Sequence, residues 1–303
     1  MNKFKKVGLT ALGTALVSTA SFAGDLSVSG SAGMTLTGND NNATGNGITM
    51  SDTLTLAGSG ELDNGWTVSL SHTLDGGVND ATSITLGMGD AGTLVFEGLG
   101  GSGPVEETDD VTPTANEESW ATVAGTVSGL ADGAEGIRNF TYTLPSLVDG
   151  LALNVFHQPT DAAQGSSTEY KAVYTGFEGL EVGYAGGENN DSLTNSIDNT
   201  NLWLKYTIDA FTLGIQSNEG DHQTASADTE FTAYGVSYAV SDELSLSYNV
   251  STVDHENTGL SDQDAQGISF SYTSGGITVG GSAHSVDNVA GTASVDNSGY
   301  ELN

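Results

Sequence analysis

The chain has no cysteine among its 303 residues and very few basic side chains. The absence of cysteine excludes both a disulfide framework and a thiolate metal site. Lys and Arg together number 6, against 39 Asp and Glu. Phosphate binding needs clustered Lys and Arg, so the composition argues against nucleic acid as a partner. A charge of this sign favours cations instead.

Long hydrophobic runs are also missing, apart from residues 7–17. A membrane-spanning helix needs about 20 apolar residues, so this run is too short to be one. It follows three lysines and precedes the small-residue pattern Ser21-Phe22-Ala23, which predicts a secretory signal peptide over residues 1–23. The mature domain is then residues 24–303, and its only basic side chains are Arg138, Lys171 and Lys205.

The chain contains instead a long alternation of apolar and polar residues. From residue 26 onward, residues such as Leu26, Val28 and Met34 alternate with Ser, Thr and Gly. A period of two indicates strands with one apolar and one polar face. Asn64-Gly65 lies between two such runs and is a strong hairpin signal.

The connections between the predicted strands are of two kinds. Tight turns are predicted at residues 63–65, 90–92, 147–150, 176–179, 209–210, 241–243 and 274–276. Longer polar loops are predicted near residues 39–47, 75–81, 98–136, 158–166, 187–197, 217–228, 254–264 and 284–297. The two kinds alternate strictly, so the pattern predicts an up-and-down chain of 16 strands.

Short connections on one rim and long ones on the other are typical of a transmembrane β-barrel. The polar face has too many small polar and charged residues to form a core, the charged ones being Glu61, Glu97, Glu169, Lys171, Glu181 and Lys205. Aromatic residues on the apolar face often lie near strand ends, which indicates interfacial girdles: Phe140, Tyr142, Tyr174, Tyr184, Tyr206, Phe211, Tyr234, Tyr238, Tyr248, Phe270 and Tyr272. We therefore predict an all-β, transmembrane, antiparallel 16-stranded barrel with a wet lumen.

One predicted loop, residues 98–136, makes its hairpin about twice as long as the others. Insertions of this length without strand alternation are usually functional or disordered. The loop has no Lys or Arg and carries eight acids, Glu106, Glu107, Asp109, Asp110, Glu117, Glu118, Asp132 and Glu135. Crowded carboxylates disfavour one another's ionisation, so raised pKa values are expected, above all in the three adjacent pairs.

Several motifs resemble the general porins of Gram-negative bacteria. Residues 137–147 (IRNFTYTLPSL) and 148–151 (VDGL) resemble the strand and turn that follow the constriction loop in that family. The 64–66 (NGW) turn and the 83–89 (SITLGMG) strand with its 90–92 (DAG) turn are similar to the alphaproteobacterial members. The resemblance implies a homotrimer of 16-stranded barrels in outer-membrane lipid.

In that family the third extracellular loop folds inward and narrows the channel, and residues 98–136 occupy its position. Relatives commonly set basic wall residues against an acidic loop. Here Arg138, Lys171 and Lys205 are the only candidates, so a mainly negative constriction is expected. Lys171 and Lys205 have the parity of the lumen face, whereas Arg138 shares the parity of Phe140 and needs a bulge to turn inward.

The C-terminus departs from the family pattern, in which the last residue is usually aromatic. The chain stops at Tyr300-Glu301-Leu302-Asn303, after about half a strand. Two explanations fit the pattern. The expected one is a truncated last strand, and the alternative is a barrel that closes differently.

The leading hypothesis is a passive diffusion channel for small hydrophilic solutes and cations, without a cofactor. The alternative is a secreted all-β adhesin whose acidic loops, at residues 188–191, 254–257 and 262–264, bind Ca²⁺ through oxygen ligands. None of these loops has the twelve-residue calcium pattern. An enzyme is not expected, because the five histidines lie in separate strands or loops without a pairing motif: His72, His157, His222, His255 and His284.

Overall fold

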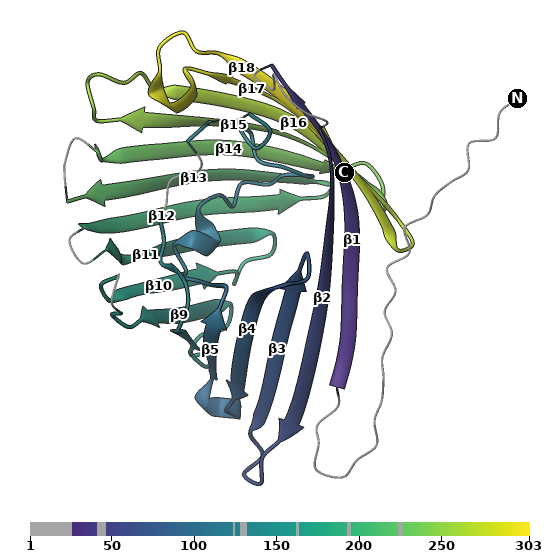
Figure 1. Cartoon of the computed structure of the whole chain (residues 1–303), viewed down its shortest axis with the longest axis vertical. Helices are drawn as coiled ribbons and strands as arrows, with labels where there is room; N and C mark the ends of the chain where they lie inside the picture. The colour runs from purple at the N-terminus through teal and green to yellow at the C-terminus, as the bar shows by residue number, and fades with distance from the viewer. Residues whose placement is uncertain are drawn as a thin grey trace, which may run out of the picture.

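The computed structural model describes residues 26–40, 47–123, 125–127, 132–161, 164–192, 195–223 and 227–303. Sixteen strands form one closed barrel in which every neighbouring pair is antiparallel, as predicted (Figure 1). The predicted signal peptide lies outside the described residues. Within the described ranges, no helix is long and apolar enough to cross a membrane.

The barrel strands follow one another around the ring in chain order. They are β1 (Leu26–Asn39), β2 (Ile48–Glu61), β3 (Thr67–Asp75), β4 (Val78–Gly87), β5 (Thr93–Leu99), β8 (Asn139–Thr143), β9 (Leu151–Gln158), β10 (Ser167–Tyr174), β11 (Leu180–Ser192), β12 (Asn195–Ile208), β13 (Phe211–His222), β14 (Thr229–Ala239), β15 (Leu244–His255), β16 (Gln263–Ser274), β17 (Ile277–Asp287) and β18 (Asn297–Leu302). The short β6 (Gly101–Ser102) and β7 (Glu135–Gly136) form a separate two-stranded sheet between β5 and β8.

All seven tight turns lie where the sequence predicts them. Two of the predictions of longer loops are wrong. Residues 75–81 reduce to the pair Gly76-Gly77, whose φ values of 54° and 79° suit a two-residue hairpin turn. Residues 187–197 are mostly strand, because β11 and β12 pair as far as Asn189 and Ile197 and again at their ends. Asn189 belongs to the lumen face and Glu188 to the outer face, and this run of polar residues resembles a loop in its composition.

The barrel closes where β18 pairs with β1 as well as with β17. The β1–β18 ladder has four residue pairs, from Leu36 opposite Leu302 to Asn39 opposite Gly299. The neighbouring β17–β18 ladder has six. Closure therefore follows ordinary antiparallel pairing across a short last strand.

The outer face is apolar and exposed, as expected for a surface in contact with lipid. Met34 and Met50 are 65% and 75% exposed. On the inner face the alternation fails at the long-loop ends of β14–β17, where Phe231, Val253 and Val286 point inward and are buried. The long segment between β5 and β8, which lies inside the lumen, covers these residues.

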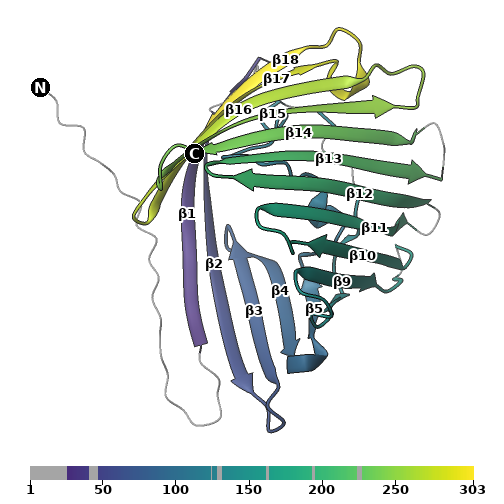
Figure 2. The same cartoon turned by 180° about the vertical axis from the view of Figure 1, so that it is seen from behind.

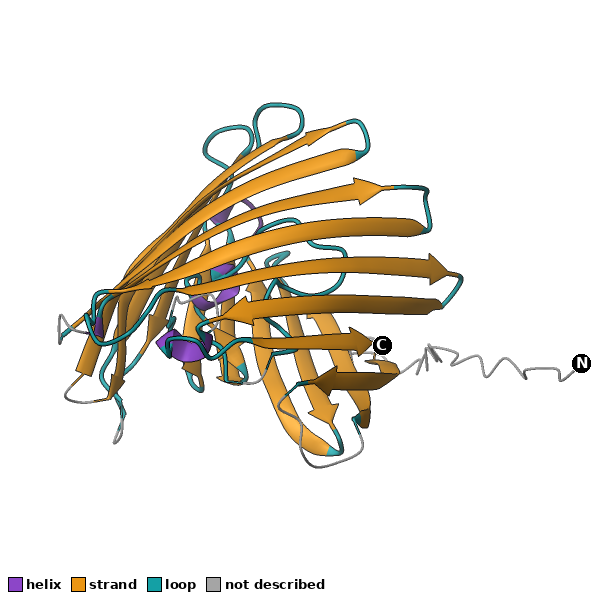
Figure 3. Cartoon of the chain, turned by 90° about the horizontal axis from the view of Figure 1, so that it is seen from above, coloured by secondary structure: helices purple, strands orange, loops and turns teal. Residues whose placement is uncertain are grey.

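The two sides of the barrel run in different directions. Strands β1–β5 lie nearly vertical in Figure 1, β9–β14 lie nearly horizontal, and β16 and β17 slope between these directions; the reverse view in Figure 2 agrees. Seen from above in Figure 3, loops and short helical turns lie within the ring of strands. The chain between β5 and β8 is therefore the part that positions the candidate site.

Candidate channel constriction

The segment between β5 and β8, residues 100–138, is called L3 here. It contains the one-turn helix η2 (Glu106–Thr108) as well as β6 and β7. It lies along the inner faces of the strands that follow it, from β10 to β18. The contacts that hold it there come mainly from the barrel wall.

Glu169 on β10 clamps both ends of L3. Its Oε2 accepts the backbone N–H of Val105 at 2.9 Å, and its Oε1 accepts the backbone N–H of Ala134 at 2.6 Å. The residue is fully buried. A buried carboxylate is tolerated where hydrogen bonds compensate its lost hydration, and here both oxygens have a donor.

Amide side chains on the wall hold the first half of L3. Asn201 on β12 donates to the carbonyls of Val105 and Thr108 at 2.9 and 3.0 Å. Gln216 on β13 donates to Thr108 O at 2.7 Å and accepts the N–H of Val111 at 2.6 Å. An amide offers both donors and an acceptor, so one side chain satisfies peptide groups of both kinds.

Amide side chains further along the wall bind the backbone of L3 in the same way. Asn249 on β15 donates to Pro113 O at 3.0 Å. Gln263 on β16 accepts the N–H of Val127 at 3.1 Å and donates to its carbonyl at 2.9 Å. Asn189 and Asn199 bind the carbonyl of Asp132 on the return path. L3 therefore forms with the wall the hydrogen bonds that a strand would form with a neighbour.

Glycines make room for this close approach. A Cβ at Gly214 on β13 would overlap Pro113 Cδ, and one at Gly235 on β14 would lie 3.0 Å from it. These two glycines are direct cross-strand partners. Further along, Gly280 faces Asn116 and Gly299 faces Thr122 in the same way.

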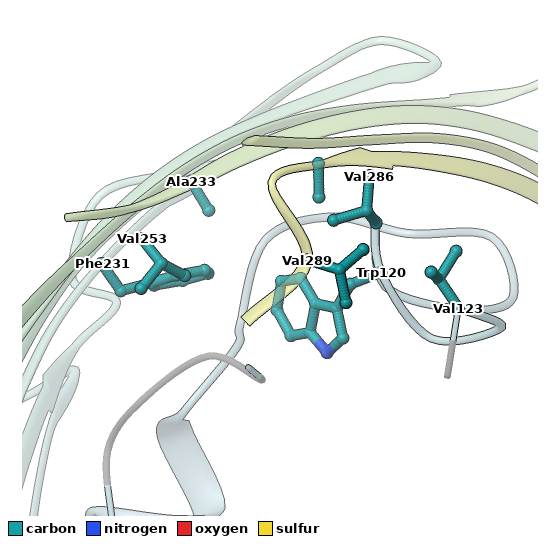
Figure 4. Packing of buried hydrophobic residues seen from close by; sticks show 8 residues of the cluster. Trp120, Val123, Phe231, Ala233, Val253, Val286 and Val289 are labelled. Carbon is teal, nitrogen blue, oxygen red and sulfur yellow. The ribbon is translucent and has the colours of Figure 1, made fainter. Parts of the chain in front are cut away.

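An apolar cluster fixes the middle of L3, as Figure 4 shows. The Trp120 ring meets Phe231 of β14 edge-on, with centroids 5.4 Å apart. Val123 of L3, Val286 of β17 and Val289 of the last long loop belong to the same cluster. Aromatic pairs of this geometry stabilise by about 0.5–1.5 kcal/mol beyond burial of their area.

The acids of L3 fall into separate groups. Glu106 lies within electrostatic reach of Asp109, Asp132 and Glu135. Asp110 accepts hydrogen bonds from the N–H and hydroxyl of Thr112, both at 2.7 Å.

The second group lies further along L3. Glu117 faces both Glu118 and Glu301, the latter on the lumen face of β18. Glu301 carries a carboxylate of this group that the sequence prediction did not include.

Of these three basic residues, Lys171 alone pairs with an acid of L3 among the described residues. Lys171 forms an ion pair with Glu107, so it does lie on the lumen face. Lys205 also faces the lumen but pairs with Glu181 of the wall at 2.8 Å.

Arg138 lies apart from both lysines. It has a positive φ of 62° and pairs with Asp161 of the β9–β10 loop at 2.7 Å, with its side chain 57% exposed. No basic group is thus left opposite the acids within the described residues.

Burial raises several carboxyl pKa values in L3. The pKa of Glu106 rises to about 7, first through burial and then through Asp109 and Glu135. The pKa of Glu117 also rises to about 7, through burial and then the neighbouring Glu118 and Glu301. Burial raises the pKa of Asp110 to about 6 despite its bonds to Thr112, and it raises that of Asp109. Loss of hydration on burial raises these pKa values more than the crowding of carboxylates does.

The opposite side of the lumen carries hydroxyl groups. Its strands, β1–β5, contain no Lys or Arg, and none of the described residues in 26–100 is buried. Ser31 and Thr53 share a hydrogen bond of 2.8 Å, and Thr55 and Thr73 one of 3.1 Å. L3 thus lies on one side of the channel and leaves this hydroxyl wall open to water.

Sequence reasoning predicted the acids of L3 but missed the residues that anchor it. The missed anchors are Glu169, Asn189, Asn199, Asn201, Gln216, Asn218, Asn249 and Gln263. Their repeated occurrence at lumen-face positions was an available signal. Across the part of the chain that the structure describes, no group of three or more His, Asp or Glu is placed to hold a metal ion.

Comparisons with known protein families and solved structures agree with one another. Residues 8–273 match the family described as Gram-negative porin. No curated protein matches the chain. Three solved structures illustrate the shared barrel.

The anion-selective porin from Comamonas acidovorans is 14% identical with a TM-score of 0.69, covering 92% of this chain and 98% of its own. The Salmonella typhi OmpF complex with daunomycin is 12% identical, with a TM-score of 0.66 and coverages of 92% and 97%. A trimer form of Vibrio cholerae OmpT, an outer membrane protein, is 13% identical, with a TM-score of 0.65 and coverages of 91% and 98%. At these identities the solved structures establish the fold, and the family match establishes the family: the chain belongs to the Gram-negative porins, the channel-forming β-barrels of the outer membrane.

Proposed function

We propose that this porin is a passive diffusion channel for small hydrophilic solutes that favours cations, with L3 as its constriction. The observation that carries the proposal is the charge arrangement of the lumen. Eight acids lie on L3, while the wall across from it, β1–β5, offers hydroxyl groups and no basic side chain. Fixed charges that line a narrow pore select ions of opposite sign.

The basic residues do not offset this arrangement. Lys171 and Lys205 are each paired with a carboxylate, Glu107 and Glu181. Arg138 is paired with Asp161. The Comamonas porin is anion-selective, so family membership does not set the sign of selectivity, and the charges of this chain have to do so. The pore-lining set we propose is Glu106, Glu107, Asp109, Asp110, Glu117, Glu118, Asp132, Glu135, Arg138, Lys171 and Lys205.

The biological unit that we propose is a homotrimer exported by a signal peptide at residues 1–23. The exposed apolar outer face of β1–β4, with Met34 and Met50 at its centre, supports association in lipid. Native electrophoresis and mass determination of the exported chain test both statements. The adhesin alternative is not favoured, because the family match points to a channel.

Selectivity is tested by reversal potential in a planar bilayer under a potassium chloride gradient. The wild type is compared with a loop variant in which six acids become amides, Glu106→Gln, Glu107→Gln, Asp109→Asn, Asp110→Asn, Glu117→Gln and Glu118→Gln. The matched control changes six exposed acids on the outer face of β11–β16, Glu188→Gln, Asp198→Asn, Asp221→Asn, Glu230→Gln, Asp254→Asn and Asp264→Asn.

The loop variant is expected to lose most of its cation preference, and the outer-face variant is expected to keep it. If the outer-face variant loses the preference and the loop variant does not, L3 is not the filter. A wild-type protein that inserts without stepwise conductance would contradict the channel itself.

A further inference from the structure

A cavity of about 630 Å³ lies between L3 and the tight-turn end of the wall. Residues 111–114 of L3 form one side of it. The turn at residues 175–179 and the adjoining ends of β11, β12 and β13 form the other. Its volume is in the range of small-molecule sites, and it lies at the end of the wall that carries the short connections.

The side formed by L3 is held in place before any solute arrives. Pro113 lies against Gly214 and Gly235, where no side chain could intervene. Val111 donates its N–H to Gln216 at 2.6 Å, and Pro113 O accepts from Asn249 at 3.0 Å. A preformed site does not have to order its own parts when a ligand binds.

The wall of the cavity carries both signs of charge next to each other. Lys205 and Glu181 are direct cross-strand partners, with Nζ and Oε1 2.8 Å apart. Their side chains are 28% and 31% exposed, so both remain accessible to a solute. Trp203 fixes the position of Glu181 by donating its indole N–H to Oε1 at 2.9 Å. The second luminal lysine, Lys171, does not line this cavity.

The rest of the lining is partly apolar. Val111 and Pro113 of L3 face it, together with Phe177 of the turn. Thr112, Thr207 and Thr212 add hydroxyl groups. A solute that fits this lining has a compact apolar part and a charged end that can meet Lys205 and Glu181 together.

We propose that this cavity is a transient binding site for small zwitterions of the α-amino acid class. The carboxylate of the solute meets Lys205 Nζ, its ammonium meets the Glu181 carboxylate, and its side chain lies against Val111, Pro113 and Phe177. A plain anion would meet the carboxylates of Glu181 and Glu178 as well as Lys205, and a plain cation would meet the lysine. Only the zwitterion keeps both members of the ion pair partnered.

The inference rests on the proposed channel function, and single-channel recording separates the two. The probe is L-leucine, compared with leucinamide, which is a cation, and N-acetyl-leucine, which is an anion. L-Leucine is expected to interrupt the current at roughly tenfold lower concentration than either analogue. Added to the side of the short turns, it should act at lower concentration than from the side of the long loops, because the cavity lies at the tight-turn end of the wall.

Variants locate the effect. Lys205→Gln, Glu181→Gln and the double variant should each remove the preference for L-leucine, and the double variant leaves no unpaired charge. Lys171→Gln is the matched control, because it breaks the other luminal lysine pair away from the cavity. Its leucine response, expressed as a fraction of its own open current, should match that of the wild type.

A second readout does not depend on current. The chain has three tryptophans, and Trp203 contacts Glu181, so L-leucine should change tryptophan emission of the folded protein in lipid vesicles. The change should vanish in Trp203→Phe and persist in Trp66→Phe. Normal conductance with equal responses to all three probes, or with no emission change that depends on Trp203, would overturn the site while leaving the channel intact.

Discussion

The two sides of the lumen are both lined by polar residues, but these residues have different roles on each side. On β1–β5 the inward side chains are mostly Ser and Thr, none of the described residues is buried, and the hydroxyls bond to one another across strands. On β10–β16 the inward side chains include Asn, Gln and Glu that are buried and bonded to the backbone of L3. Polarity on the lumen face therefore means hydration on one side and structural support on the other.

The difference explains how a wide barrel holds a loop without a hydrophobic core. A 16-strand interior is too wide for side chains to fill, so L3 is fixed mainly by hydrogen bonds and by glycines that let it approach. The apolar contribution is confined to the cluster around Trp120 and Phe231. If the comparison is right, charges placed on the hydroxyl wall change selectivity, while changes to the anchoring wall alter stability and pore shape.

The largest effect is expected from placing basic residues on the hydroxyl wall. Ser31→Arg, Thr55→Arg and Ser71→Arg put three charges on β1, β2 and β3, none directly opposite another. A unit charge at roughly 8 Å in water changes an ion's energy by about 0.5 kcal/mol, or about twofold in local concentration. The three together should raise the local concentration of anions roughly tenfold and lower that of cations by a similar factor, so the reversal potential should shift toward anion selectivity.

The control for size carries Gln at the same three positions and should keep the wild-type sign of the reversal potential. Equal reversal potentials for the Arg and Gln variants would mean that this wall does not border the ion path.

The second effect concerns the clamp on L3. Glu169→Gln keeps the shape of the side chain but turns one acceptor into a donor that faces a peptide N–H, and an unsatisfied buried group costs about 1–3 kcal/mol. The free energy of unfolding in urea should fall by that amount, and proteases should cut L3 faster. On the other wall, Thr55→Val removes the bond to Thr73 and should change stability by less than about 0.5 kcal/mol. Similar losses in the two variants would erase the distinction between the walls.

The third effect is a pH dependence that belongs to L3. The pKa values of Glu106 and Glu117 lie near 7 in the folded protein, against an ordinary value of 4.5. As the pH falls from 8 to 5 these groups take up protons, so the loop loses negative charge and cation preference should decrease. The reversal potential of the Glu106→Gln, Glu117→Gln variant should vary much less over that range.

Stability should move in the opposite sense. Because the folded state binds more protons than the unfolded state between the two pKa values, the free energy of unfolding rises as the pH falls from about 7 toward 4.5. A wild-type protein that loses stability over this window would contradict the raised values in L3.

The smallest effect is expected from the glycines of the anchoring wall. Gly214→Ala places a methyl group against Pro113, so L3 must shift away from β13 and the single-channel conductance should change modestly. Gly60→Ala on β2 has no atom within 4 Å of the new methyl group and should leave the conductance unchanged. An unchanged conductance in Gly214→Ala would show that Pro113 can move without altering the pore.

The fold was predictable because period-two alternation and turn chemistry are local signals. The alternation around Leu26 and Val28, with Asn64-Gly65 and the other tight turns, sufficed to predict 16 strands. The same local reasoning misread residues 187–197, where Asn189 faces L3 and the run of polar residues resembles a loop. Polarity alone does not distinguish a side chain that faces water from one that binds another segment.

The charge of the site was predictable from the sequence, but the wall residues that hold L3 in place were not. The acids of L3 lie in one stretch of sequence, so their presence could be inferred. The expected rise in pKa is found for Glu106, Asp109, Asp110 and Glu117, but burial is its largest cause in each, and the prediction had named crowding. The partners of the loop are far away: Gln216 binds Val111 across 105 residues, and Glu301 meets Glu117 from the last strand. No local pattern encodes such pairs, because they depend on how the barrel closes.

The anchors of L3 also carry a consequence for the order of assembly. Glu169 lies 64 residues beyond Val105, and Gln263 lies 136 residues beyond Val127, so the loop is synthesised long before most of the groups that hold it. Contacts of such sequence separation form slowly, since the intervening chain must first be closed. A barrel that adds its strands in chain order would therefore keep L3 undocked until β16 is in place. Docking of the loop should then be the last event in refolding, reported by the burial of Trp120 after the β-sheet signal is complete.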